Sequence, residues 1–297
     1  MKFEPKGIIV PVVTPFTAEE ELNLRGYRQI VEHLLESGVH GIFPFGTTGE
    51  FYGVTDKEYL QLLEATVEQV NGRVGVYAGT YSITTRGVIA QIKLCEKVAG
   101  IDAVSVLTPM FISQTQEELY QHYRSIAEST SMPIVLYNNK PKTNVTIAPE
   151  TVARLAEIPN IIAIKDSTGD MTNTSEYIRL TRGNPNFHVL MGRDTLILAG
   201  LCYGASGAIA ACANVAPKQV VSVYERYVSG DMPGALDAQL ALNPLRIAFG
   251  MGTFPAVIKE GLVQQGYYAG KCLKPIAELS PAEKDSLHTI LQKMKLL

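Results

Sequence analysis

The chain has 297 residues, of which 46% are hydrophobic, enough apolar material for a large folded core, so general disorder is excluded. The formal net charge is −3, and Lys, Arg, Asp and Glu are mixed along the sequence. No basic tract, acidic tail or arginine stripe indicates a nucleic acid or a membrane surface as a partner.

The chain begins with a short charged segment. Residues 1–6 (MKFEPK) contain charges and a proline where a secretory signal needs an apolar core, so we expect no signal peptide. Four cysteines lie far apart and form no CxxC pair, which predicts reduced thiols and a cytoplasmic location. These cysteines are Cys95, Cys202, Cys212 and Cys272.

Eight short apolar runs then recur, each followed by a turn and a stretch of helical length. They begin near residues 7, 41, 74, 103, 133, 161, 188 and 207. Because most are apolar throughout and do not alternate, they are typical of strands covered on both faces of a parallel sheet. Two of the intervening stretches start with capping boxes, which predict helix N-termini: Thr55 with Glu58, and Thr115 with Glu118.

The repeated strand–helix unit predicts an α/β fold, a (β/α)₈ TIM barrel over residues 1–230. A doubly wound sheet is the alternative, but the first run is followed by 13-VTPFTAEEE and not by a GxGxxG loop. Further helical segments at 233–250, 254–266 and 281–295 exceed what a barrel needs, so they predict a C-terminal helical subdomain over residues 231–297.

One uncharged stretch, between Asp194 and Lys218, is long enough to span a bilayer. However, glycines interrupt it, its first half has helical spacing, and its second half has the composition of a strand. A helix followed by a buried strand explains it better, so we expect no membrane segment.

Polar side chains follow several of the predicted strands. In a barrel of this kind the active site forms at the carboxyl ends of the strands. These ends carry Thr14, the turn 46-GTTGE-50, Tyr137 with Asn138, and Lys165 with Asp166.

The sixth run, 161-IIAIK-165, ends in a lysine. A lysine is almost never fully buried unless it is compensated, so either Lys165 emerges into water or it lies in a pocket where chemistry needs it. Strand alternation places Ile161, Ala163 and Lys165 on one face and Ile162 and Ile164 on the other. The small Ala163 below the lysine suits an inward position.

A lysine in an apolar site loses hydration of its ammonium form, so its pKa falls and the neutral amine becomes able to attack a ketone. A neighbouring tyrosine hydroxyl can move the protons that imine formation requires. The GTTGE turn offers backbone N–H groups and two hydroxyls to a carboxylate. A 2-oxo acid has both the ketone and the carboxylate.

Other chemistries are less well supported. The five histidines are scattered and show no metal-ligand spacing, so we expect no metal site. Ser206 lies outside a GxSxG motif, and no residue near it in the sequence suggests a base.

Several motifs in a specific order carry a family resemblance. They are 11-PVVTPF, 45-FGTTGEF, 107-LTP, 117-EELYQHY, 136-LYNN, 162-IAIKDSTGD, 192-GRD and 207-GAIAACANVAP. On these motifs the chain resembles the dihydrodipicolinate synthase/N-acetylneuraminate lyase family of Schiff-base aldolases over essentially its whole length.

The resemblance implies that Lys165 forms an imine with pyruvate or a related 2-oxo acid, without any other cofactor. It implies that Tyr137 is the general acid and base, that Thr47 relays protons, and that Thr48 helps to bind the carboxylate. The turn residue Gly46, the backbone carbonyl of Ile209, and Gly192 would complete the pocket. An aldehyde as second substrate and a homo-oligomer, either a dimer or a tetramer, are also implied.

Departures from the family pattern leave the second substrate open. Phe111 stands where a tyrosine usually completes the relay from a neighbouring subunit. Lys142 stands where synthases for aspartate semialdehyde usually have an arginine, and Arg193 adds a cation near the pocket. A dihydrodipicolinate synthase-like lyase, an aldolase or dehydratase for 2-keto-3-deoxy sugar acids or a related lyase, and a barrel that binds a 2-oxo acid without turning it over remain possible.

Overall fold

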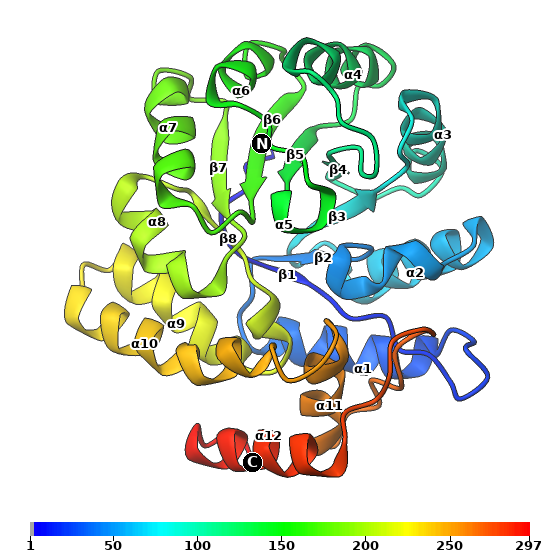
Figure 1. Cartoon of the computed structure of the whole chain (residues 1–297), viewed down its shortest axis with the longest axis vertical. Coiled ribbons are helices and arrows are strands. Elements are labelled where there is room, and N and C mark those ends of the chain that lie inside the picture. The colour runs from blue at the N-terminus through cyan, green and yellow to red at the C-terminus, as the bar shows by residue number, and fades with distance from the viewer. Residues whose placement is uncertain (1–2) are drawn as a thin grey trace.

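The computed structural model describes residues 3–297, so the first two residues of the segment interpreted as lacking a signal peptide lie outside it. Eight parallel strands pair in chain order and close on themselves, with β1 next to both β2 and β8 (Figure 1). This confirms the predicted TIM barrel. The strands are β1 (Gly7–Pro11), β2 (Gly41–Phe43), β3 (Gly75–Thr80), β4 (Ala103–Leu107), β5 (Ile134–Asn138), β6 (Ile161–Asp166), β7 (His188–Met191) and β8 (Gly207–Ile209).

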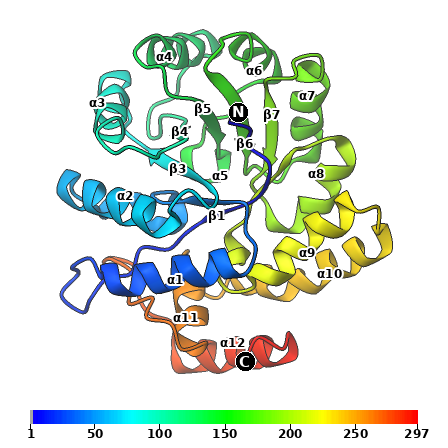
Figure 2. The ribbon, with the colours of Figure 1, turned by 180° about the vertical axis from the view of Figure 1, so that it is seen from behind.

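Helices surround the barrel, and Figures 1 and 2 both show α11 and α12 outside this ring, beyond α1. The helices that follow the strands are α1 (Leu24–Glu36), α2 (Asp56–Val70), α3 (Thr85–Cys95), α4 (Gln116–Glu128), α5 (Lys140–Thr143), α6 (Pro149–Leu155), α7 (Met171–Thr181), α8 (Ile197–Tyr203) and α9 (Pro217–Val228). The C-terminal helices are α10 (Met232–Ala248), α11 (Ala256–Gln264) and α12 (Pro281–Lys293).

The helix starts follow from local chemistry. Both predicted capping boxes are present: the side chains of Thr55 and Thr115 accept hydrogen bonds from the N3 backbone of α2 and α4. In return, Glu58 and Glu118 accept from the backbone N–H of the cap residue. These reciprocal bonds satisfy donors that a helix N-terminus otherwise leaves unpaired.

The barrel interior is filled by a compact apolar cluster. Its members are Ile9, Phe43, Tyr77, Ala103, Val135, Ile162, Ala163, Leu190 and Ile209. Ala163 is inside as predicted, but Ile162 also belongs to this cluster, whereas Ile161 packs with the outer core. The simple alternation is wrong here because the β5–β6 register shifts between Ile134 and Val135, which interrupts the period of two.

The three predicted C-terminal helices are present as α10, α11 and α12. Their buried Leu242, Leu262 and Leu287 join the same core cluster as the outer faces of the barrel strands. The boundary near residue 230 stays a prediction. The uncharged stretch forms α8 and β8, and no helix among residues 3–297 is long and apolar enough to cross a membrane.

Candidate active site

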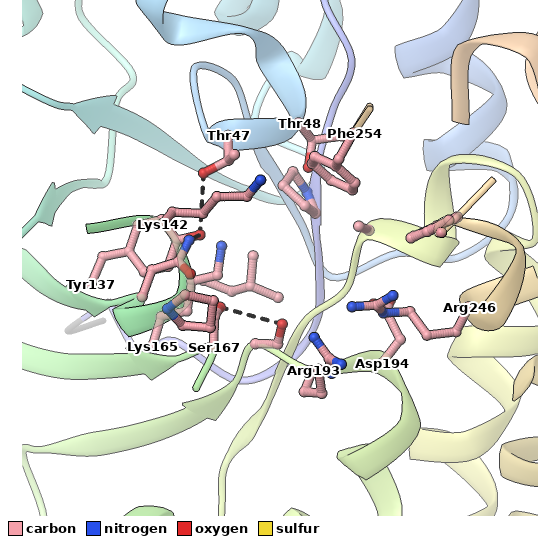
Figure 3. A pocket seen from close by; sticks show the side chains of 18 residues that line it. Thr47, Thr48, Tyr137, Lys142, Lys165, Ser167, Arg193, Asp194, Arg246 and Phe254 are labelled. Atoms are coloured by element: carbon pink, nitrogen blue, oxygen red, sulfur yellow. Dashed lines mark hydrogen bonds and ion pairs between the residues drawn. The ribbon is translucent and has the colours of Figure 1, made fainter. Parts of the chain in front are cut away.

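A cavity of about 270 Å³ lies at the carboxyl ends of the strands (Figure 3). It brings together eight of the nine predicted site residues: Thr47, Thr48, Tyr137, Lys142, Lys165, Gly192, Arg193 and Ile209. Gly46 lines a small adjoining cavity that shares Thr47 and Tyr137 with the larger one. The strand-end rule had singled out Thr47, Thr48, Tyr137 and Lys165, and the resemblance had implied the others.

Lys165 lies at the centre of this cavity, and its side chain is buried. It is only 4% exposed, and it is paired across the sheet with Tyr137 in the β5–β6 register. Its Nζ lies 3.9 Å from the centroid of the Tyr137 ring and 5.3 Å from that of Phe43. Within the described residues it makes no ion pair, so aromatic faces are its main electrostatic support. Lys165 is not a strand end in water.

The buried Tyr137 hydroxyl is the polar group beside this amine. It lies 3.4 Å from the Thr47 hydroxyl and accepts a hydrogen bond of 2.9 Å from Asn139 Nδ2. Burial opposes ionisation of the phenol, but the nearby Lys165 ammonium and the hydrogen bonds outweigh it, so the pKa of Tyr137 lies below its ordinary value. The phenol is thus suited to exchange a proton with a neighbouring group.

The turn that carries Thr47 and Thr48 has an unusual backbone. Residues Thr47–Gly49 form a short 3-10 turn, and Phe45 and Glu50 on either side have φ values of 59° and 54°. Non-glycine residues rarely adopt this left-handed conformation, and it persists only where the surroundings hold it. Here Phe45 stacks on a tyrosine ring at 4.3 Å between centroids.

Contacts from distant segments fix the same turn. The Thr14 hydroxyl donates to the Gly49 carbonyl at 2.7 Å. Glu50 is fully buried, forms an ion pair with the buried Lys259, and accepts a 2.7 Å hydrogen bond from the Leu273 N–H. Burial raises the pKa of Glu50 and lowers that of Lys259, although each partner's charge opposes these shifts. Glu50 is therefore an anchor for the turn.

Asp166, next to Lys165, holds neighbouring segments by hydrogen bonds. Its carboxylate accepts from Asn138 Nδ2 at 3.1 Å, from the Thr168 N–H at 3.1 Å and from the Thr174 hydroxyl at 2.6 Å. These bonds tie the end of β6 to β5 and to the start of α7. The carboxylate thus orients the strand end that presents Lys165.

Gly192 is required by a close approach of strands β6 and β7. Its N–H donates to the Asp166 carbonyl at 2.7 Å, and a Cβ at this position would lie 2.0 Å from the Ser167 Oγ. No larger residue fits without moving that wall of the cavity. Ile209, at the end of β8, packs in the barrel interior below the cavity.

The two predicted cations enter from different sides. Lys142 is exposed on α5 and reaches the cavity from its mouth, near Thr47 in Figure 3. Arg193 lies on the opposite side of the cavity, after β7. Burial first, and then the neighbouring Arg246, lowers the pKa of Arg193.

Sequence analysis did not identify Arg246 and Ser167, which also line the cavity. Ser167 follows Lys165–Asp166 directly and was detectable from its position at a strand end. Arg246 lies in the last turn of α10, in the segment assigned to the C-terminal subdomain. No local pattern indicates that this turn reaches the barrel mouth.

Two other positions carry information about alternatives. Phe111 is 94% exposed with φ of 74°, and it does not line the cavity of its own chain. The Ser206 hydroxyl lies 2.9 Å from Nδ1 of His188, a base that the sequence around Ser206 did not indicate. That pair lies at the amino ends of β7 and β8, opposite to Lys165. Among residues 3–297, no group of three or more His, Cys, Asp or Glu is arranged to hold a metal ion.

Comparisons with known proteins find relatives over nearly the whole chain. Residues 4–294 match the sequence pattern of the dihydrodipicolinate synthetase family. A 4-hydroxy-tetrahydrodipicolinate synthase of Thermodesulfovibrio yellowstonii is 38% identical over 292 residues, 98% of this chain and 99% of the relative.

Solved structures are similar over the same length. The dihydrodipicolinate synthase of Thermotoga maritima is 33% identical with a TM-score of 0.96, covering 99% of this chain and 100% of that one. YagE, a prophage protein of the dihydrodipicolinic acid synthase family from E. coli K12 in complex with pyruvate, is 31% identical with a TM-score of 0.94, covering 98% and 99%.

Proposed function

The chain belongs to the dihydrodipicolinate synthetase family, and on this premise we propose that Lys165 forms a covalent imine with pyruvate or a closely related 2-oxo acid. Membership makes the protein an enzyme, a Schiff-base lyase of the class I aldolase type with dihydrodipicolinate synthase-like activity. The observation that carries the proposal is the buried Lys165 amine, which lies 3.9 Å from the Tyr137 ring centroid and has no carboxylate partner within residues 3–297.

In this proposal the lysine amine attacks the C2 carbonyl of the 2-oxo acid, and one water leaves as the imine forms. Tyr137 donates and accepts the protons of these steps, and Thr47, at 3.4 Å, passes them on. Loss of a proton from C3 gives an enamine, whose C3 forms a bond to an aldehyde carbon while the aldehyde oxygen gains a proton. Water then hydrolyses the imine, which restores the amine.

The 2-oxo acid carboxylate is held by the turn that begins at Gly46. The Thr48 hydroxyl and the backbone N–H groups of this turn supply the donors, and Gly192 and Ile209 supply close-fitting walls. Lys142 and Arg193 contact the remainder of the substrate from opposite sides. No cofactor is needed in this scheme, because the protonated imine itself withdraws the electrons.

We favour aspartate semialdehyde as the aldehyde, as in 4-hydroxy-tetrahydrodipicolinate synthases, the name that the curated relatives share. A second candidate is an aldolase or dehydratase for 2-keto-3-deoxy sugar acids. Lys142 in place of an arginine fork, and Phe111 without a hydroxyl, favour that candidate, since lysine lacks bidentate geometry. An aldehyde panel with pyruvate, compared with cleavage of 3-deoxy-2-oxo acids, separates the two.

We also propose a cytoplasmic homo-oligomer, a dimer or a tetramer. The exposed Phe111 and half-exposed Ile112 support an interface, and the absence of disulfides among the four cysteines supports a reducing compartment. Light scattering that shows a monomer at micromolar concentration would contradict the oligomer.

The test of the imine is borohydride trapping with pyruvate. One reduced pyruvyl group per chain is expected, and peptide mapping should place it on Lys165. The exposed Lys142 and the buried Lys259 serve as internal controls within the same digest. A label on either of them, or no label at all, contradicts the proposed nucleophile.

A further inference from the structure

The active-site cavity carries more positive than negative charge. Four cationic side chains line it, namely Lys142, Lys165, Arg193 and Arg246, against a single carboxylate, Asp194. Cations brought together in a partly buried site repel one another and lose hydration, so such a cluster is costly unless an anion offsets it. A carboxylate bound at the Thr47–Thr48 turn would lie beside only part of this cluster.

Asp194 forms an ion pair with Arg246 but supplies only one negative charge among the four cations. Its side chain is buried, and one oxygen accepts a 2.8 Å hydrogen bond from the Cys212 N–H. The other oxygen pairs with Arg246 Nε at 3.4 Å, a separation longer than that of an ordinary N–H···O hydrogen bond. The carboxylate therefore holds the loop after β8 and orients Arg246, while the two Nη groups of that arginine make no hydrogen bond within residues 3–297.

Arg193 has still less support. Its guanidinium makes no hydrogen bond or ion pair within the described part of the chain, although Asp194 and Arg246 are within electrostatic range. It lies close over Gly169, where a Cβ would be 3.7 Å from its Nε. The lack of a side chain at Gly169 leaves room for the arginine to lie beside the cavity.

We propose that Arg193 and Arg246 form an anion subsite that binds the distal carboxylate or phosphate of the aldehyde substrate. This inference rests on the proposed function, because it needs a second substrate beside the Lys165 imine. Figure 3 shows both guanidinium groups on the side of the cavity away from Thr47, with Lys165 between the two sides. The product of the condensation fits this arrangement, because it carries the 2-oxo acid carboxylate at one end and the anion of the aldehyde at the other.

Two guanidinium groups suit this role better than the lysine at the mouth. Each presents N–H donors in a planar fork that matches the oxygens of a carboxylate or phosphate, whereas an ammonium is a point charge. Lys142 is also exposed, so solvent weakens its attraction. The arginine subsite, more than Lys142, thus selects acidic aldehydes over neutral sugars of similar length.

The experiment measures kcat/KM for pyruvate condensation with three aldehydes: D-glyceraldehyde, which is neutral; D-glyceraldehyde 3-phosphate; and succinate semialdehyde. The variants are Arg193→Gln, Arg246→Gln, Arg246→Lys and Lys142→Gln. Arg86→Gln is the matched control, since Arg86 is exposed in the first turn of α3 and does not line the cavity. Borohydride trapping of pyruvate is measured in parallel for each protein.

We expect Arg193→Gln and Arg246→Gln to lower kcat/KM for an anionic aldehyde at least about tenfold more than for the neutral one, given the strength of hydrogen bonds to charged groups. Arg246→Lys should recover part of the loss. The aldehyde that shows the larger discrimination, phosphate or carboxylate, identifies the natural anion. Arg193 has no ion pair to break, so its variant remains informative if Arg246→Gln fails to fold.

The subsite is overturned if pyruvate trapping stays intact and the arginine variants lose kcat/KM equally for neutral and anionic aldehydes. It is also overturned if only Lys142→Gln loses the preference for anionic aldehydes. Loss of trapping in the wild-type protein would instead reject the proposed function. The two failures are therefore distinguishable in one set of measurements.

Discussion

Two lysines are buried in the described part of the chain, and only one of them is paired with a carboxylate. Lys259 is 2% exposed, pairs with the buried Glu50, and donates a 2.7 Å hydrogen bond to the Lys271 carbonyl. Lys165 is 4% exposed and has aromatic rings around its amine but no carboxylate. Because burying an ammonium is costly in either place, only the first arrangement is explained by stability alone.

The difference teaches how to separate structural charge from functional charge in this fold. A compensated pair joins segments that are far apart in the sequence. Here Glu50 attaches the turn that carries Thr47 and Thr48 to the C-terminal region. An uncompensated cation leaves its donors available, as Lys165 and Arg193 do around one cavity. Arg246 pairs with Asp194 through Nε but leaves its two Nη groups available at the same cavity. The two kinds of site are neighbours, since Glu50 follows directly after Thr47–Gly49.

The largest expected contrast comes from replacing each lysine by methionine. Lys165→Met should lose all turnover and pyruvate labelling. It should also raise the free energy of unfolding by roughly 1 kcal/mol or more, since the groups that an active site needs often destabilise the fold. Lys259→Met should lower the free energy of unfolding. Urea unfolding at fixed protein concentration measures both, and a destabilised Lys165→Met protein would contradict the distinction.

The next effect concerns the proton carrier beside Lys165. Tyr137→Phe should fold normally and lose roughly 10²–10⁴-fold in turnover, the usual contribution of a positioned acid or base. Tyr123→Phe is the matched control, because that buried hydroxyl donates to the Val106 carbonyl at 3.4 Å and lies outside the cavity. Steady-state assays that give equal turnover for both variants would show that protons travel by another route.

The compensated pair should behave as a unit. Lys259→Met leaves the buried Glu50 without its cation, which typically costs about 3–5 kcal/mol of unfolding free energy. The double variant with Glu50→Gln removes that unpaired charge and keeps an acceptor for the Leu273 N–H, so it should recover much of the loss. If the loss of unfolding free energy in the double variant equals the sum of the losses in the two single variants, the residues act independently.

Sequence analysis predicted the site of Lys165 but missed the buried pair of Lys259 and Glu50. Lys165 and Tyr137 end apolar runs, so the barrel rule was enough to place them at one rim. Glu50 was noted only as the last residue of the GTTGE turn, because its partners lie far along the chain. Leu273 is 223 positions away. Such pairings depend on how α10 and α11 pack on the barrel, which no local pattern determines.

The same reason explains Arg246 and the error in strand β6. The α10 turn that carries Arg246 is recognisable as helix, but its distance from Lys165 follows from tertiary packing. The exchange of Ile161 and Ile162 between inner and outer clusters follows from a register shift with β5, which single-strand alternation does not reveal. Element type and strand ends were accessible from sequence, and contacts between distant elements were not.

His122 represents a third way to bury a basic group, which is to remove its charge. It is buried on α4, its Nδ1 lies 2.9 Å from the Thr85 hydroxyl, and burial lowers its pKa to about 4. Between that value and the ordinary one near 6.5, the unfolded chain binds more protons than the folded chain, so stability rises with pH. The contribution is fully present above about pH 6.5 and is lost as the pH falls toward 4.

We therefore expect acidification through this window to cost the folded state on the order of 3 kcal/mol through this one residue. His122→Gln keeps a polar side chain without titrating, so its urea midpoint should change less between pH 7 and pH 4 than that of the wild type. His288→Gln on the exposed face of α12 is the control and should follow the wild type. If the two variants show the same pH dependence, His122 is not held neutral, and burial of a basic group here needs a partner after all.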